Sequence, residues 1–269
     1  MISLPIGLGI ASPATSVSYE TESVAYFAAM SVQPDDTRKG LLNTLIATLK
    51  TGGVYANLDW LNINAAHDAQ AARVNVITPS QVASAVNAPT FTTDRGYTGD
   101  GATSYLDTGW NPSTASSPKF VRDSCHMGVW CGTNVQSSAM TDVGNVFAMM
   151  NSRNNPNAIR YTPQLSGVIG TTYAPTTSVG HSMWQRTTSL LHEVARDGAQ
   201  VHTGSNASLA VPNSNILICA QNNSTTGTIT PANYSSRRIQ AVHWGAQLTS
   251  GQITTLYNAL SAYMTAVGA

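Results

Sequence analysis

The residues best suited to chemistry lie in one glycine- and aspartate-rich stretch, FTTDRGYTGDGATSYLDTGW, at residues 91–110. Its carboxylates, Asp94, Asp100 and Asp107, could serve a cation site, a phosphate loop, a catalytic cluster or a set of turns. A phosphate loop is disfavoured, because the glycines precede a strand-like segment and no lysine follows them. An EF-hand calcium loop is disfavoured, because it needs acidic ligands at alternating positions and a distal glutamate. The stretch therefore predicts two strands joined by a Gly/Asp turn that binds no ion.

Patterns for catalysis elsewhere in the chain are weak. Retaining glycosidases need two carboxyl groups about 5 Å apart, and the three glutamates, Glu20, Glu22 and Glu193, form no such pattern. Glu193 is expected at the surface beside a hairpin. The chain also has no G-x-S-x-G nucleophile motif. We therefore expect no catalytic residue and no cofactor, and the sequence predicts that the protein is not an enzyme.

Cysteines and histidines give no metal pattern. The three cysteines, Cys125, Cys131 and Cys219, lack the spacing of a metal site and cannot all pair in disulfides, so we expect buried thiols in a protein assembled in a cytoplasm. His192 and His202 could meet across a hairpin, but no acidic residue accompanies them. His243, beside a tryptophan, is expected to be a packed core histidine. We predict no metal ligand.

The composition excludes several classes of partner. Only 10% of residues are charged, and thirteen basic side chains balance thirteen acidic ones, so the chain lacks the basic face that nucleic-acid binding requires. No polybasic run or long apolar run indicates a membrane. Solubility must rest on hydroxyl and amide side chains, as in AQNNSTTGTITPANYSS (220–236). Such a surface suits sugars, although a charge-poor loop is the simpler interpretation.

Helical patterns dominate the first quarter of the chain. ESVAYFAAM (22–30) predicts a short helix, and Asp35 and Asp36 suit the first turn of a longer helix that ends at Gly52 or Gly53. A weaker apolar stripe through 57–72 suggests a third helix. The first strand-like segment is then RVNVI (73–77).

Short strand-like runs separated by turn residues follow, which is typical of a β-sandwich. Asp197-Gly198 between extended segments predicts a hairpin, and Tyr105 and Leu106 should point to opposite faces of a strand. Thr249 and Gln252 predict a capping box that begins a C-terminal helix. The expected strands are 89–93, 103–108, 126–133, 144–150, 158–162, 166–173, 182–195, 199–203, 214–220 and 237–245.

Four phrases, in order, resemble concanavalin A-like (laminin G-like) jelly-roll domains. GYTGDGATSYLDTGW resembles the early strand pair, CHMGVWCGTN the central strand, SLLHEVARDGAQV a hairpin, and RRIQAVHWGAQLTSGQITTLYNAL the closing strand. Together they cover roughly residues 85–260. The resemblance implies a mostly β fold, a concanavalin A-like jelly-roll β-sandwich with a small N-terminal helical block and a C-terminal helix.

The preceding helical block, especially LLNTLIATLKTGGVYANLDWLNINAAHDAQAARVN (41–75), resembles the segment that precedes such domains in virion proteins of tailed bacteriophages and prophages. It implies a virion localisation, after synthesis in the bacterial host cytoplasm. We expect an N-terminal arm at 1–19, a helical anchoring and oligomerisation block at 20–72, and the jelly roll with its closing helix at 73–269. The arm and helices would contact other virion proteins and form a homo-oligomer.

The function that this resemblance favours is a tail or head appendage that binds a cell-surface glycan. The alternatives are a structural decoration or joining protein without a ligand, and a polysaccharide depolymerase. Tryptophans 110, 130, 184 and 244 are expected in the core. The candidate ligand-binding residues are aromatic and amide side chains near polar loops, namely Tyr161, Tyr173, Asn222, Asn223 and Tyr234.

Overall fold

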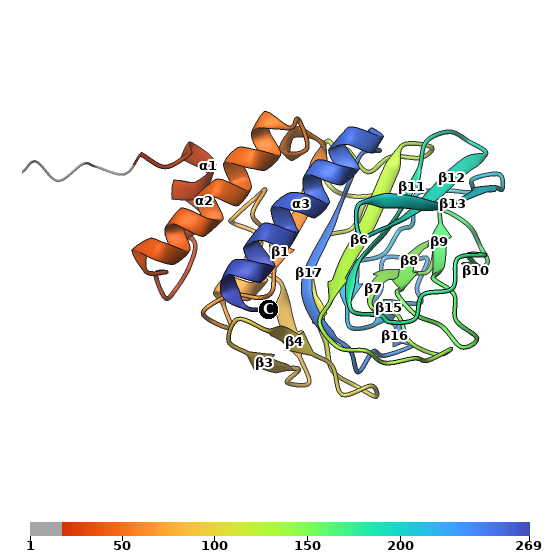
Figure 1. Ribbon diagram of the computed structural model, residues 1–269. Coiled ribbons are helices and arrows are strands. Elements are labelled where there is room, and N and C mark those ends of the chain that lie inside the picture. Colours follow the sequence, from red (N-terminus) through yellow and green to blue (C-terminus); the bar gives the residue numbers. More distant parts are fainter. Residues whose placement is uncertain (1–17) are drawn as a thin grey trace, which may run out of the picture.

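The computed structural model describes residues 18–269, which form two β-sheets packed face to face with helices over one of them (Figure 1). The predicted mostly β sandwich with a helical block and a closing helix is confirmed. The N-terminal arm expected at 1–19 lies outside the described residues, except for its last two positions.

One sheet, here called the helix-covered sheet, has eight strands in the order β13-β12-β11-β6-β17-β4-β3, with β1 beside β17. β17 pairs with β6 along one edge, and with β4 and then β1 along the other, so it is the most connected strand. The strands are β1 Leu58–Ile63, β3 Thr90–Thr92, β4 Gly96–Thr98, β6 Cys125–Cys131, β11 Gly180–Arg186, β12 Leu191–Arg196, β13 Ala199–Ser205 and β17 Arg238–Gly245.

The second sheet, here called the open sheet, has nine strands in the order β10-β9-β8-β7-β14-β5-β2, with β15 beside β7 and β16. Its pairings are antiparallel apart from a single parallel bridge between β15 and β7. The strands are β2 Ser84–Val86, β5 Tyr105–Asp107, β7 Val143–Asn145, β8 Ala148–Asn151, β9 Arg160–Pro163, β10 Ile169–Gly170, β14 Leu217–Ile218, β15 Gln221–Asn222 and β16 Pro231–Ala232.

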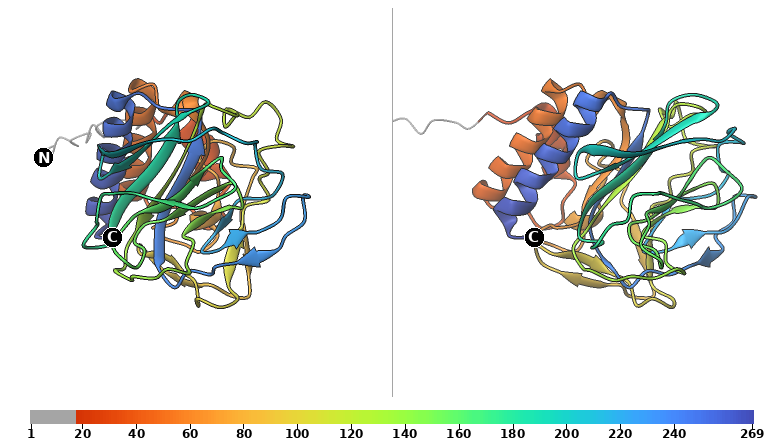
Figure 2. Two further views of the ribbon diagram at one scale, coloured as in Figure 1. Left: turned by 90° about the vertical axis from the view of Figure 1, so that its right-hand side faces the viewer. Right: turned by 45° about the vertical axis from the view of Figure 1, so that its right-hand side comes forward.

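Residues 18–269 contain three α-helices, which begin and end close to the predicted positions: α1 (Thr21–Ala28), α2 (Asp36–Thr51) and α3 (Ser250–Val267). Asp35 caps α2 by accepting a hydrogen bond from the Arg38 backbone, and Thr249 and Gln252 form the predicted capping box of α3. Figure 2 shows α2 and α3 side by side over the helix-covered sheet. Each buries one apolar stripe, as an amphipathic helix should.

The third helix predicted at 57–72 is wrong. Residues 58–63 form strand β1, flanked by 3-10 turns at Tyr55–Asn57 and Ala71–Arg73. Long-range pairing overrides the weak helical pattern, because β1 pairs with the far end of the chain and Trp60 stacks on Trp244 with ring centroids 5.2 Å apart. The segment 73–77 is not a strand either; it contributes only the bridge of Val74 to Val82.

The predicted strand 144–150 is also interrupted, since β7 and β8 form a hairpin there. The hairpin predicted at Asp197-Gly198 is confirmed between β12 and β13, with φ values of 48° and 80° at these two residues. Tyr105 and Leu106 do point to opposite faces: Leu106 lies in the main core, and Tyr105 lies in a small cluster with Leu217 and Ala220.

The aspartates of the 91–110 stretch shape the backbone. The Asp100 carboxylate accepts backbone hydrogen bonds from residues 102, 103 and 104 at 2.8–2.9 Å. Asp94, at φ 60° between β3 and β4, pairs with Arg38 at 2.6 Å. The expectation of one strand pair needs correction, because β4 belongs to the helix-covered sheet and β5 to the open sheet. The Asp100 turn therefore carries the chain from one sheet to the other.

Three buried histidines form a hydrogen-bonded chain on the side of the helix-covered sheet that faces α3. His126 (β6) Nε2 lies 3.0 Å from His243 (β17) Nδ1, and His243 Nε2 lies 2.8 Å from His181 (β11) Nε2. His126 Nδ1 contacts the Ala246 carbonyl oxygen. Tyr257 of α3 lies over His181, with ring centroids 6.2 Å apart. His243 is thus the core histidine that was predicted.

The Ala246 carbonyl sets the direction of this chain. A carbonyl only accepts, so His126 must donate through Nδ1 and accept through Nε2. His243 then donates through Nδ1, and His181 donates through Nε2. Each ring carries one proton. A second proton on His126 Nε2 or His243 Nε2 would place two N–H groups against each other, whereas His181 Nδ1 has no hydrogen-bond partner in the described chain. Burial lowers the pKa of His126 to about 4 and, with nearby Arg196, that of His181 to about 3; burial also lowers the pKa of His243.

We expect acid to destabilise the fold through these three histidines. Below the ordinary histidine pKa of about 6.5, these histidines bind protons in the unfolded chain but stay neutral in the folded protein. The free energy of unfolding therefore falls as pH falls from about 6.5 toward 3. The loss is on the order of 2 kcal/mol each for His126 and His181 by pH 5, and His243 adds to it in the same direction. Urea unfolding at pH 7, 6 and 5 measures it. A free energy of unfolding that is the same at pH 7 and pH 5 would contradict the inference that the three histidines are neutral in the folded protein.

Candidate functional site

A polar pocket of about 450 Å³ opens where the start of β1 meets two loops, 77–81 and 109–119. Its volume lies within the range of about 300–1,000 Å³ usual for small-molecule sites. Hydroxyl and amide groups dominate its lining, and one tryptophan contributes. The lining residues are Leu58, Asp59, Ile77, Thr78, Gln81, Gly109, Trp110, Asn111, Thr114, Ala115, Ser116, Ser117, Pro118 and Lys119.

Asp59 attaches the long loop to the sheet. Its carboxylate accepts hydrogen bonds from the backbone N–H groups of Lys119, at 2.9 Å, and Phe120, at 2.7 Å. The Lys119 ammonium in turn donates to the Leu58 carbonyl oxygen at 2.5 Å. Burial raises the pKa of Asp59, and these backbone donors oppose the shift. One anion and one cation therefore line the pocket, and both are partly engaged by the protein.

Trp110 supplies the aromatic surface. Its ring packs edge-on against Phe120, with centroids 6.3 Å apart, and lies tilted against Trp244 at 5.7 Å. The predicted core position is confirmed, since only 6% of the side chain is exposed, yet the residue also lines the pocket. Its backbone is held at both ends, by Thr108 Oγ1 at 3.1 Å and by the Ile216 N–H at 3.0 Å.

Asn111 shapes the loop that carries the hydroxyls. Its Oδ1 accepts from the Ser113 N–H at 3.0 Å, and its Nδ2 donates to Asn213 Oδ1 at 2.9 Å. Thr114 and Ser116 follow on the exposed part of the loop. Sequence reasoning missed this pocket. The available signal was the tryptophan set among turn and hydroxyl residues in GWNPSTASSPK (109–119).

The five predicted ligand residues fall into two separate groups. Tyr161 and Tyr173 lie on or after β9 and β10, whereas the other three lie around β15 and β16; β8 and β7 separate the groups in the open sheet. Tyr161 is buried, and its hydroxyl lies 3.0 Å from His192 Nδ1. The Tyr161 ring lies 5.6 Å from the His192 ring and 6.3 Å from the His202 ring, measured between centroids. Tyr161 therefore contacts both histidines of the hairpin.

The second group includes both inward and outward side chains. Asn222 is buried and accepts from the backbone N–H of Thr230 at 2.9 Å, so it organises its own loop. Asn223 is exposed. Tyr234 is half-buried against Tyr105, with ring centroids 6.3 Å apart. A ligand role for these five residues stays a prediction.

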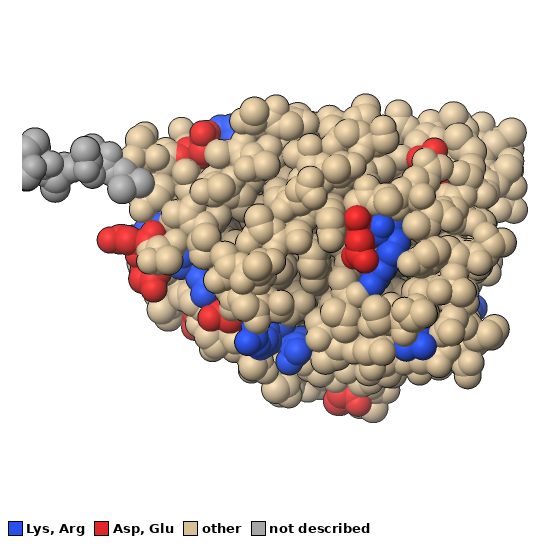
Figure 3. All heavy atoms as spheres, in the orientation of Figure 1, with Lys and Arg blue, Asp and Glu red and all other residues tan. Residues whose placement is uncertain are grey.

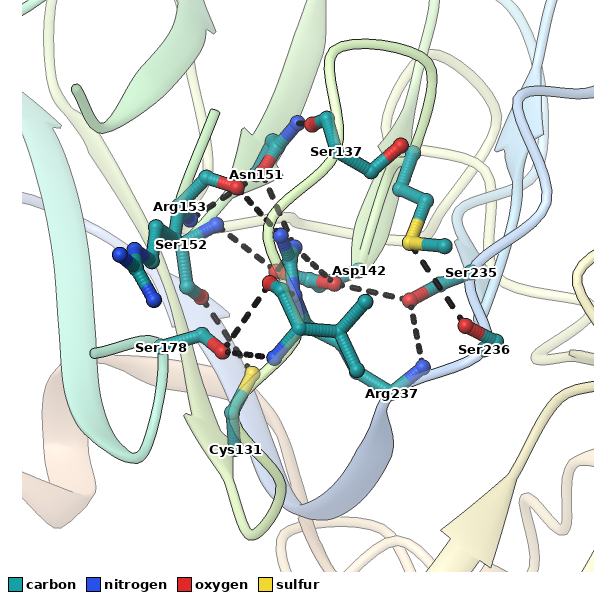
Figure 4. Close-up of polar contacts among 12 residues, drawn as sticks. Cys131, Ser137, Asp142, Asn151, Ser152, Arg153, Ser178, Ser235, Ser236 and Arg237 are labelled. Carbon is teal, nitrogen blue, oxygen red and sulfur yellow. Dashed lines mark hydrogen bonds and ion pairs between the residues drawn. The ribbon is translucent and has the colours of Figure 1, made fainter. Parts of the chain in front are cut away.

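A buried charged network joins the two sheets near their ends (Figure 4). The Arg237 guanidinium, before β17, binds both carboxylate oxygens of Asp142, before β7, at 2.9 Å, and neither side chain is exposed. The same guanidinium donates to Asn151 Oδ1 at 2.9 Å. Asp142 also accepts from Ser235 Oγ at 3.0 Å and from the Ser152 N–H at 2.8 Å. These contacts saturate the pair, so its role is structural.

Three further observations concern the cysteines, the potential metal ligands and the helices of residues 18–269. The three cysteines are buried and unpaired, and burial raises the pKa of each thiol, to about 12 at Cys219. Within this range no three histidine, cysteine, aspartate or glutamate side chains gather as a metal-binding group. None of the described helices is both long and apolar enough to cross a membrane.

Comparisons with known proteins identify the fold and no family. No family model matches the chain. No curated protein matches it either. Among solved structures it is similar to a Trypanosoma rangeli sialidase complexed with a difluorinated nononic acid (TM-score 0.50, 11% identity, 83% of this chain and 40% of the sialidase). It is also similar to the botulinum neurotoxin serotype C1 binding domain (TM-score 0.51, 11% identity) and to the binding domain of Paraclostridial Mosquitocidal Protein 1 (TM-score 0.51, 12% identity). Each of these two matches covers 77% of this chain and 53% of the other chain.

The chain thus spans about half or less of the length of the structures it resembles. One expectation is wrong in the light of them, namely that the protein is not an enzyme. Sialidases share this fold, so the absence of a familiar carboxylate pattern does not exclude catalysis on it. Binding domains of toxins share the fold equally.

We expect Asp142→Ala to be strongly destabilising. The substitution leaves the Arg237 guanidinium buried without a counter-charge, which costs about 3–5 kcal/mol. Asp36→Ala is the matched control, since its side chain is 97% exposed and its contact with Lys39 spans 3.8 Å; it should cost less than about 0.5 kcal/mol. Urea unfolding at pH 7 measures both. Equal losses in the two variants would show that the buried pair does not hold the sheets together.

Proposed function

We propose that the protein binds carbohydrate in the pocket beside Trp110. The observation that carries the proposal is the combination of an indole ring with a rim of hydroxyl and amide groups in one cavity. Sugars offer apolar faces that contact aromatic side chains and hydroxyls that exchange hydrogen bonds with such a rim. Its two charged residues are partly engaged by backbone groups, so the pocket favours a polar ligand of low charge.

Two further observations support this proposal. Figure 3 shows that charged residues are few and scattered on one face of the molecule, so most of the described surface there is uncharged. Among the proteins of similar fold, the cell entry of botulinum neurotoxin type C depends on interaction with two ganglioside molecules; its structure matches with a TM-score of 0.50 and 12% identity. Because the likeness concerns the fold alone, the pocket chemistry has to carry the proposal.

We also propose that the protein acts as a virion appendage and that residues 1–19 and 20–72 anchor it and hold a homo-oligomer. The support is the resemblance of this segment to bacteriophage proteins. An oligomer would strengthen weak single sites through multivalency. Residues 20–72 contain β1, which pairs with β17. The anchoring block and the jelly roll (73–269) would therefore fold as one unit.

Filling the pocket should abolish glycan binding. Ser116→Trp adds bulk at an exposed lining position without removing a hydrogen bond recorded for that side chain. We expect at least a tenfold lower signal than wild type on a glycan array probed with streptavidin-clustered protein. Ser250→Trp, the same change in a different cavity, should bind as wild type does. No glycan bound by wild type, or unchanged binding by Ser116→Trp, would contradict the proposal.

A further inference from the structure

A second cavity, of about 690 Å³, lies between the β12–β13 hairpin and the start of α3. One side is apolar, formed by Leu248 and Ile253, which are 3% and 6% exposed. The polar part of the lining includes Glu193 and Gln200. We call this space the α3 cavity. It is separate from the pocket beside Trp110, and the two share no lining residue.

Glu193 is a fixed carboxylate without a counter-charge. Gln185 Nε2 donates to Glu193 Oε2 at 2.7 Å, and Gln185 Oε1 accepts from the Leu248 N–H at 2.9 Å. Gln185 is only 3% exposed, so this neutral amide holds the carboxylate in position. Among residues 18–269, no lysine, arginine or histidine forms an ion pair with Glu193. Its full negative charge therefore faces the α3 cavity.

The neighbouring polar groups also favour a ligand that donates hydrogen bonds. Gln200 Nε2 donates to Thr203 Oγ1 at 2.7 Å, which leaves the Gln200 amide oxygen as an acceptor. Thr187 also lines the cavity, and its buried hydroxyl has no hydrogen-bond partner within the described chain. An amine with an aliphatic chain would match both sides, since its N–H groups could meet these oxygens while its methylenes cover Leu248 and Ile253.

The N-terminus of α3 opposes a cation only weakly. A helix N-terminus carries about half a positive charge, and its effect falls off within the first turn. The Thr249 side chain already accepts from the Gln252 N–H, and Gln252 accepts from the Thr249 N–H in return. The whole negative charge of Glu193 therefore dominates the field in the α3 cavity.

We propose that the α3 cavity binds a primary alkylammonium ion, with its ammonium on the Glu193 carboxylate and its methylenes against Leu248 and Ile253. Butylammonium is the probe, and butanol is its neutral counterpart of similar shape. In ¹⁵N NMR titrations of the full chain, we expect butylammonium to shift the amide signals of Ala199, Leu248 and Ile253. Its affinity should exceed that of butanol at least fivefold, because only the cation pairs with the carboxylate.

Matched variants separate charge from shape. Glu193→Gln keeps the size of the side chain and should lower butylammonium affinity at least fivefold while leaving butanol unchanged. Glu20→Gln makes the same change on a glutamate outside the cavity and should bind butylammonium as wild type does. Ser250→Trp fills the cavity and should abolish binding of both probes. Ser116→Trp should leave both unchanged, so this site and the glycan pocket succeed or fail independently.

The proposal is overturned if butylammonium causes no shifts in the α3 cavity of the wild-type protein. It is also overturned if butanol binds as tightly as butylammonium, or if Glu193→Gln keeps wild-type affinity for the cation. Folding of each variant is verified from the dispersion of the same spectra. A tenfold loss in Glu193→Gln, with Glu20→Gln unaffected, would assign the ammonium contact to this carboxylate.

Discussion

The buried pair of Arg237 and Asp142 is the constraint from which the rest of the structure follows. Two charges removed from water are costly unless their hydrogen bonds are complete, and here a serine, an asparagine and backbone groups complete them. Because Arg237 precedes β17 and Asp142 precedes β7, the pair fixes the start of one strand in each sheet. β17 then positions β6, β4 and β1 along its two edges. These strand pairings position the pocket beside Trp110, because Asp59 lies on β1 and Trp244 lies on β17.

Local signals in the sequence predicted the elements whose determinants lie within a few residues. The start of α2 at Asp35 and Asp36, the Thr249–Gln252 capping box and the Asp197-Gly198 turn are of this kind, and all three formed as expected. The sandwich itself was predictable from the order of four motif-like phrases. A local pattern failed where a distant partner decided the outcome. Residues 58–63 have a weak helical stripe, but their pairing with residues 241–245 makes them a strand.

The position of the candidate site was not predicted from the sequence for the same physical reason. Asp59 and the 109–119 loop are about fifty residues apart in the chain, and only the folded sheet brings the carboxylate to the Lys119 and Phe120 backbone. Tyr161 and Asn222 show how burial is hidden from the sequence. Both lie near polar loops in the sequence, yet each is buried and hydrogen-bonded within the protein. Composition indicated a sugar-compatible surface without indicating which loop would form a cavity.

Helix α3 connects the two titratable features of the helix-covered sheet. Its Tyr257 lies over His181 and stacks on Trp130, with ring centroids 5.7 Å apart in the stack. Its first turn forms one side of the α3 cavity opposite Glu193. A second proton on His126 or His243 would place a buried charge and two opposed N–H groups under this helix, and so would weaken its hold on the sheet. A ligand that needs the folded position of α3 therefore binds more tightly to the form in which the histidines are neutral. By linkage, cation binding and histidine protonation must therefore oppose each other. As the pH falls, a larger part of the cation's binding free energy offsets the cost of keeping the three histidines neutral.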